Sequence, residues 1–114
     1  MIKAVFRFVK GTQTITKVSL SGHAEMGEYG YDIVCAGVSA LMIASINGLD
    51  EYVQTKTNVK IENGETSFEI NETDGYKSIQ AQAIANTLYL AMLGMQDEYE
   101  DYIEVIITEE EKDD

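Results

Sequence analysis

The sequence is short of the residues that build metal sites and disulfides, with one cysteine and one histidine among 114 residues and no proline. A single cysteine excludes an internal disulfide framework and fits the reducing cytoplasm, where we expect the protein to act. One cysteine and one histidine cannot form a four-ligand zinc site without two carboxylates, and neither CxxC nor HxxxH spacing occurs. Phosphate-binding glycine loops are also absent from the sequence. We therefore expect neither a metal nor a cofactor.

Basic residues are scarce, since eight lysines and arginines stand against 20 acidic residues, for a net charge of −12. This balance argues against direct nucleic-acid binding, which needs a surplus of positive charge at the phosphates. Two interpretations of the negative charge stay open. It either speeds the approach of a basic partner or serves solubility alone.

Long apolar runs and linkers are missing as well. No stretch approaches the eighteen or more apolar residues of a membrane span, and the first eight residues lack the apolar centre of a signal peptide. We therefore expect no membrane partner. The absence of repeats and low-complexity segments predicts one domain over residues 1–108, followed by an acidic tail at 109–114.

The hydrophobic pattern predicts five strands and two helices. Alternating residues predict strands over 2–9 and 14–21, joined by a turn at 10–13, and Asn63-Gly64 predicts a second hairpin between 58–62 and 66–70. Helical spacing predicts one helix from Asp32 to about 53–56 and another over roughly 76–97, and a last strand covers 102–108. The expected core faces of the helices are Val34, Val38, Leu41, Met42, Ser45, Leu49 and Tyr52, then Ile84, Leu88, Ala91, Met92 and Met95. The order ββαββαβ indicates a two-layer α+β sandwich, a mainly antiparallel sheet with both helices on one face.

The only cysteine and the only histidine lie twelve residues apart, on either side of a glycine-bearing loop predicted over 22–31. Asp32 is a good N-cap, which would make Cys35 the third residue of the following helix. There the helix dipole would stabilise a thiolate by roughly 0.3–1 kcal/mol, so protonated His23 would have to supply most of the activation. N–H groups near Cys35 and Ala36 would be free to bind an oxyanion. The arrangement favours a cysteine nucleophile with a histidine acid–base.

Each of these residues also has an ordinary structural interpretation. Judged by position alone, Cys35 is explained better as a small buried apolar side chain, as most free cysteines are, and a lone histidine is usually structural. Asp32 either caps the helix or orients His23, and Ser39, one turn after Cys35, either donates to the thiol or bonds a carbonyl of its own helix. Gly22 before His23 would allow the backbone to approach closely at a site.

The motifs Gly22-His23-Ala24 and Gly30-Tyr31-Asp32-Ile33-Val34-Cys35-Ala36, continuing to Leu41, closely resemble the signature of the ribosomal-processing cysteine protease family Prp. The resemblance implies that His23 and Cys35 are the catalytic pair. It implies a homodimer that removes a short hydrophobic N-terminal extension from a large-subunit ribosomal protein precursor, the twenty-seventh in the standard naming. It also implies a mobile loop over the substrate, for which Gly27, Tyr29, Gly30 and Tyr31 are the candidates.

Two rival functions come from other classes. The protein could be a non-catalytic ribosome-associated protein that binds the same extension without cutting it. Alternatively, it could be a structural or regulatory oligomer in which Cys35 belongs only to the core.

Overall fold

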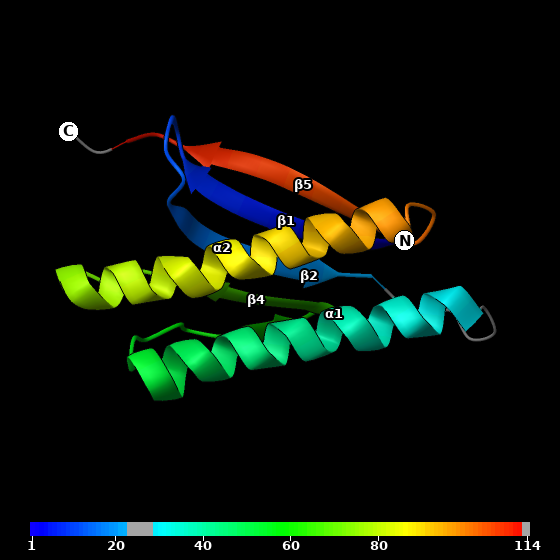
Figure 1. Ribbon diagram of the computed structural model, residues 1–114, viewed down its shortest axis with the longest axis horizontal. Coiled ribbons are helices and arrows are strands. Elements are labelled where there is room, and N and C mark those ends of the chain that lie inside the picture. Colours follow the sequence, from blue (N-terminus) through cyan, green and yellow to red (C-terminus); the bar gives the residue numbers. More distant parts are fainter. Residues whose placement is uncertain (23–28, 113–114) are drawn as a thin grey trace.

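The computed structural model describes residues 1–22 and 29–112, and it places two antiparallel helices on the same face of one sheet (Figure 1). The predicted α+β sandwich and the order ββαββαβ are confirmed. The elements are β1 (Ile2–Val9), β2 (Ile15–Ser21), α1 (Tyr29–Asn47), a π-helical continuation η1 (Gly48–Val53), β3 (Lys60–Glu62), β4 (Glu65–Glu69), α2 (Gly75–Glu98) and β5 (Ile103–Glu110).

The sheet is mixed, with the strand order β3-β4-β2-β1-β5. The pairs β1–β2, β2–β4 and β3–β4 are antiparallel, whereas β5 lies parallel to β1 at the edge. The strand β5 continues through Glu109 and Glu110, which the sequence pattern assigned to the tail. The Lys10 N–H donates to the Glu110 carbonyl at 2.8 Å, so pairing with the end of β1 extends the strand.

The β3–β4 hairpin turns at the predicted dipeptide. Asn63 and Gly64 both have positive φ, 51° and 76°. A two-residue hairpin turn of the primed type requires this conformation at both central positions. The backbone preference of asparagine and glycine therefore fixes where the chain reverses.

The core lies between the helices and the covered face of the sheet. In β1 the residues Ile2, Ala4 and Phe6 are buried, as their alternation predicts. The expected helix faces are largely confirmed, but Tyr52 is 78 % exposed and Val53 is buried instead. The π-helix explains this difference, because its wider turn shifts the face that points inward.

The stretch Asp32–Val53 is long and apolar enough to cross a bilayer by length and composition alone, which the sequence pattern did not predict. Within it, Val34, Val38 and Met42 are buried against the rest of the domain. A core helix of a globular domain has the same properties, so this feature is weak evidence for a membrane.

Candidate active site

Cys35 lies in the second turn of α1. The helix begins at Tyr29, so Cys35 is its seventh residue and Asp32 belongs to its first turn. The prediction that Asp32 is the N-cap, with Cys35 as the third helical residue, is therefore wrong. Glycine disfavours helix, which made Gly30 look like part of a loop, but an acidic side chain in the first turn stabilises a helix that starts earlier.

This earlier start removes two of the advantages expected for Cys35. Only the first four N–H groups of a helix lack intrahelical partners, and the dipole effect fades within the first turn. The N–H groups of Cys35 and Ala36 come later, so the oxyanion site predicted from them is not supported by this helix. Ala36 is exposed, outside the cavity that contains Cys35. The start of α1 therefore offers the Cys35 thiol little activation of its own.

Cys35 is half-buried and borders a small cavity of about 160 Å³. Its side chain also packs against the hydrophobic core. Its position therefore fits both a structural and a catalytic cysteine. The cavity is lined from β1, β2, α1 and the β3–β4 hairpin, by Ile2, Leu20, Ser21, Gly22, Cys35, Val38, Ser39, Gly64 and Thr66.

Gly22 closes one side of this cavity through a close backbone approach. Its φ is +131°, and a Cβ there would lie 2.8 Å from the Ile2 Cα and 2.9 Å from the Met1 carbonyl oxygen. Only glycine fits such a conformation and such a contact. The chain therefore leaves β2 tightly against the start of β1, at the wall of the Cys35 cavity.

The other predicted site residues divide into three groups. Ser39 lines the cavity with Cys35, one helical turn further along α1. Tyr29, Gly30 and Tyr31 form the beginning of α1, so the loop predicted over 22–31 is shorter than expected. His23 and Gly27, with the rest of 23–28, lie outside the described residues.

Sequence reasoning missed the contribution of the β3–β4 hairpin. Gly64 and Thr66 line the cavity although they are far from Cys35 in the sequence. The register Leu20↔Thr66 brings the turn of this hairpin to the end of β2. The Asn63-Gly64 signal located the turn, but only the pairing of β4 with β2 shows which cavity it borders.

Among residues 1–22 and 29–112, no group of three or more histidine, cysteine, aspartate or glutamate side chains is arranged to hold a metal ion. Within the described residues, the cysteine of this cavity therefore has no metal site beside it.

Comparisons with known proteins agree on one family. Residues 1–104 match the family model described as Cysteine protease Prp. The chain is 33 % identical over 89 residues to the ribosomal processing cysteine protease Prp of Staphylococcus aureus, covering 78 % of this chain and 83 % of that protein.

Solved structures support the same relationship. The S. aureus protease in complex with a substrate peptide aligns with a TM-score of 0.83 and 26 % identity, covering 95 % of this chain and all of that one. The same protease with a covalently linked product peptide aligns with a TM-score of 0.80 and 28 % identity, over equal shares of the chains.

Proposed function

The chain belongs to the cysteine protease Prp family and is a ribosomal processing cysteine protease. We propose that Cys35 and His23 remove the N-terminal extension of one large-subunit ribosomal protein, the twenty-seventh in the standard naming. One related structure is that of the S. aureus protease with a covalently linked product peptide, which supports covalent catalysis by a thiol in this family. Cys35 is the only cysteine of this chain.

The observation that carries the proposal is the shared cavity of Cys35 and Gly22. Gly22 is held against Ile2 by a contact that only glycine allows, and His23 is the next residue in the sequence. The only histidine therefore follows directly on a backbone position fixed at the wall of the thiol's cavity. A base is required there, because the helix start at Tyr29 leaves Cys35 beyond the strong part of the dipole.

In the proposed reaction, the Cys35 thiolate attacks the carbonyl carbon of the scissile bond and a C–S bond forms. The C–N bond then breaks, and the His23 imidazolium donates its proton to the departing amine. A water molecule next attacks the thioester while His23 accepts its proton. The C–S bond breaks with the sulfur leaving as thiolate, the carboxylic acid product departs, and the starting thiolate–imidazolium pair is restored. Ser39 and Asp32 are candidates for positioning the thiol and the imidazole.

The decisive experiment is incubation of the purified protein with the ribosomal protein precursor, followed by sequencing of the new N-terminus. We expect one cut at the end of the extension with the wild-type chain and none with Cys35→Ala. Glu51→Ala, an exposed change on η1 that does not border the Cys35 cavity, is the matched control and should cut normally. Cleavage by a folded Cys35→Ala variant would rule out Cys35 as the nucleophile.

We further infer a cytoplasmic homodimer. The free thiol supports a reducing compartment. For the dimer, the support is an apolar groove of about 390 Å³ on the helix layer, bordered by α1 and α2. Exposed grooves of this character are typical of protein contacts. The lining residues are Leu41, Ala44, Ser45, Gly48, Ala83, Ile84, Thr87, Leu88 and Ala91.

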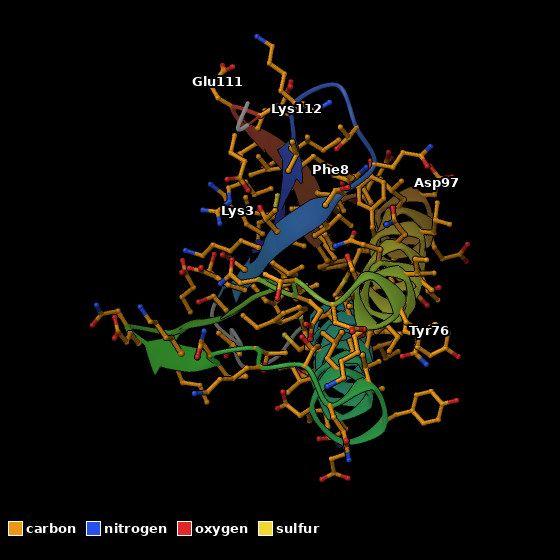
Figure 2. The ribbon with its side chains drawn as sticks, turned by 90° about the vertical axis from the view of Figure 1, so that its left-hand side faces the viewer. Lys3, Phe8, Tyr76, Asp97, Glu111 and Lys112 are labelled. Carbon is orange, nitrogen blue, oxygen red and sulfur yellow. The ribbon has the colours of Figure 1, made fainter. Side chains whose placement is uncertain are left out.

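Analytical ultracentrifugation tests this arrangement. The exposed Ala83 lines the groove, and Ala83→Glu keeps a good helix former while placing a charge there. We expect the wild-type chain to sediment as a dimer and Ala83→Glu as a monomer. Lys3→Glu, on the sheet face away from the helices (Figure 2), is the control and should remain dimeric. A monomeric wild-type chain, or a dimeric Ala83→Glu variant, would contradict the proposal.

A further inference from the structure

The chain contains the dipeptide asparagine–glycine twice, at Asn47-Gly48 and at Asn63-Gly64. This dipeptide is chemically reactive, because glycine has no side chain to shield its nitrogen from the carbonyl carbon of the asparagine side chain. Attack by that nitrogen closes a five-membered succinimide ring. The reaction needs an accessible side chain, a glycine N–H without a hydrogen-bond partner, and a backbone that is free to rotate between the two residues. The fold decides which of the two dipeptides meets these conditions.

Asn47-Gly48 lies within a continuous run of helical backbone, where α1 passes into η1. Asn47 has the helical φ and ψ of −62° and −41°, and backbone N–H groups in such a run donate within the helix. Gly48 is also packed against α2, since a Cβ on it would lie 3.2 Å from the Ile84 Cδ1. Rotation between the two residues would break helical hydrogen bonds on both sides. We therefore expect this dipeptide to be unreactive in the folded chain.

Asn63-Gly64 instead forms the exposed turn between β3 and β4. The last pair of the ladder is Glu62↔Glu65, so the Gly64 N–H lies outside the ladder. Among residues 1–22 and 29–112, no hydrogen bond holds either that N–H or the Asn63 side chain. The strand β3 has only three residues, all exposed, and it pairs only with β4. Opening this end of the sheet therefore breaks few hydrogen bonds, which allows the turn to reach the geometry of attack.

The same turn forms part of the wall of the Cys35 cavity. Gly64 and Thr66 line this cavity together with Cys35. The length and the backbone conformation of a hairpin turn fix the register of the strands that it joins. A covalent change in the main chain at Asn63 would therefore move the Gly64 side of the cavity.

We propose that Asn63 deamidates spontaneously in the folded protein and that the product remodels the Cys35 cavity. The Gly64 nitrogen loses its proton to hydroxide and attacks the Asn63 Cγ. A C–N bond forms, and the side-chain nitrogen takes up a proton from water and leaves as ammonia. Water then adds to one carbonyl carbon of the ring, and the ring C–N bond at that carbon breaks. Opening at Cγ leaves aspartate, and opening at the main-chain carbonyl carbon leaves isoaspartate. Overall, one water is consumed and one ammonia is released.

Both products change the turn. Isoaspartate carries the main chain through its Cβ and Cγ, which adds one methylene to a turn whose geometry suits two ordinary residues. Each product also places a new carboxylate between Glu62 and Glu65 in the sequence, so three acidic residues follow within four positions. We expect the Gly64 wall to shift and cleavage to fall as the protein ages. The fall in cleavage rests on the proposed function, whereas the modification itself does not.

Peptide mass mapping of the aged chain tests the modification without any substrate. The folded wild-type chain is held at mildly alkaline pH with a thiol reductant, and the fragments that contain Asn47 and Asn63 are followed over time. We expect Asn63 to convert to aspartate and isoaspartate at least tenfold faster than Asn47. In urea the two should react at similar rates, because the fold no longer distinguishes them. Equal rates in the folded chain, or an Asn63 that stays intact while the unfolded chain reacts, would overturn the proposal.

Two variants separate the effect on the cavity from ageing in general. Asn63→Gly cannot form the ring, and glycine at both central positions suits the same primed turn. Asn47→Ala keeps a good helix former and leaves Asn63 intact. Each aged chain is compared with its own fresh sample.

We expect the wild-type and Asn47→Ala chains to lose cleavage of the extension peptide in proportion to the fraction of Asn63 converted, while Asn63→Gly keeps its fresh rate. Alkylation of Cys35 by iodoacetamide should change in the same samples, and it reports on the cavity even if the chain cuts no peptide. A converted wild-type chain whose cleavage and alkylation match the fresh sample, or an equal loss in Asn63→Gly, would overturn the remodelling.

Discussion

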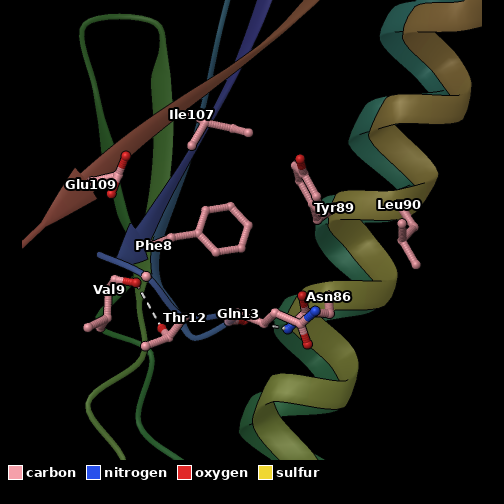
Figure 3. Close-up of a pocket in the computed structure, with 10 residues that line it drawn as sticks. Phe8, Val9, Thr12, Gln13, Asn86, Tyr89, Leu90, Ile107 and Glu109 are labelled. Atoms are coloured by element: carbon pink, nitrogen blue, oxygen red, sulfur yellow. Dashed lines mark hydrogen bonds between the residues drawn. The ribbon is translucent and has the colours of Figure 1, made fainter.

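The two ends of β1 carry cavities of different construction. Around Ile2, the Cys35 cavity encloses only about 160 Å³ and is bordered by two serines, a threonine and two glycines together with aliphatic side chains. Around Phe8, the cavity at the β5 edge encloses about 580 Å³ and is bordered by two aromatic rings and aliphatic side chains together with longer polar ones (Figure 3). The first is closed by a backbone contact at Gly22, and the second is left open beside an unpaired strand edge.

This difference shows that the volume of a cavity does not indicate where the reactive side chain lies in this fold. The larger cavity contains no cysteine or histidine among its lining residues, whereas the smaller one contains the only thiol. Bond cleavage needs reacting groups held at short range, which a tight cavity provides. The open cavity offers apolar surface instead, at Ile107 and Leu90.

The largest effect should come from removing the proposed base. His23→Ala should lower the cleavage rate by about 10²–10⁴, the usual contribution of a positioned general acid or base. Alkylation of Cys35 by iodoacetamide at neutral pH should slow in parallel, because the thiolate loses its partner. If His23→Ala keeps the wild-type rates of alkylation and cleavage, the Cys35 end of β1 has no histidine-activated thiol, and the two ends no longer differ in function.

Gly22→Ala should have the next largest effect. The added methyl group would collide with backbone atoms of Ile2 and Met1 at a φ that alanine rarely adopts. We expect a loss of about 1–3 kcal/mol in the free energy of unfolding. Cleavage should fall more than this loss of folded protein explains, since the wall of the thiol's cavity moves. Gly11→Ala, also at positive φ but in open space, is the control and should preserve cleavage. Normal cleavage by a folded Gly22→Ala chain would contradict this role.

Gln82→Ala should lower the stability of the fold without changing the rate of cleavage. The Gln82 side chain accepts from the Ile15 N–H and donates to the Ile15 carbonyl, both at 2.8 Å. Ile15 is fully buried, so the variant leaves two backbone groups unsatisfied. We expect a loss of about 2–4 kcal/mol by urea denaturation. Cleavage of a short extension peptide by the folded fraction should match the wild-type rate, and a fall in that rate would mean that the two ends are coupled.

The sequence predicted the fold well because local signals decided most of it. Alternation predicted β1, and Asn63-Gly64 predicted the turn between β3 and β4. The helix start was predicted wrongly, because Gly30 and Asp32 resemble a loop followed by a cap when they are judged by propensity alone. The parallel pairing of β5 and the place of Thr66 beside Cys35 depend on long-range pairing, which no local pattern encodes.

Added salt should have a smaller effect, which distinguishes steering of a basic substrate from solubility as the role of the acidic surface. Raising the ionic strength from about 0.05 to 0.5 M shortens the Debye length well below ~10 Å. If the charge steers a basic substrate, kcat/KM for the full ribosomal protein precursor should fall several-fold through the association rate. An uncharged peptide of the extension alone should change little. Equal salt dependence of the two substrates would assign the net charge of −12 to solubility.

The smallest effect concerns Glu72, just before α2. Its carboxylate accepts hydrogen bonds from the backbone N–H groups of Thr73 and Asp74, each at 3.0 Å. The hydrogen bond from the Thr55 side chain, followed by those from the N–H groups of Asp74 and Thr73, lowers the pKa of Glu72 below its ordinary value of 4.5. A lowered pKa means that the charged form is favoured in the folded chain. The stability it contributes is therefore present above pH 4.5 and is lost as the pH falls through the lowered pKa.

Glu72→Gln should accordingly unfold at a slightly lower urea concentration at pH 7, and the difference from the wild-type chain should shrink in acid. Glu51→Gln is the matched control, because Glu51 is exposed and its side chain has no hydrogen bond in the described part of the chain. Cleavage of the extension peptide should not change between the wild-type chain and Glu72→Gln near pH 7. A stability difference that grows on acidification would contradict the expected sign, because it would require the folded chain to favour the protonated carboxyl.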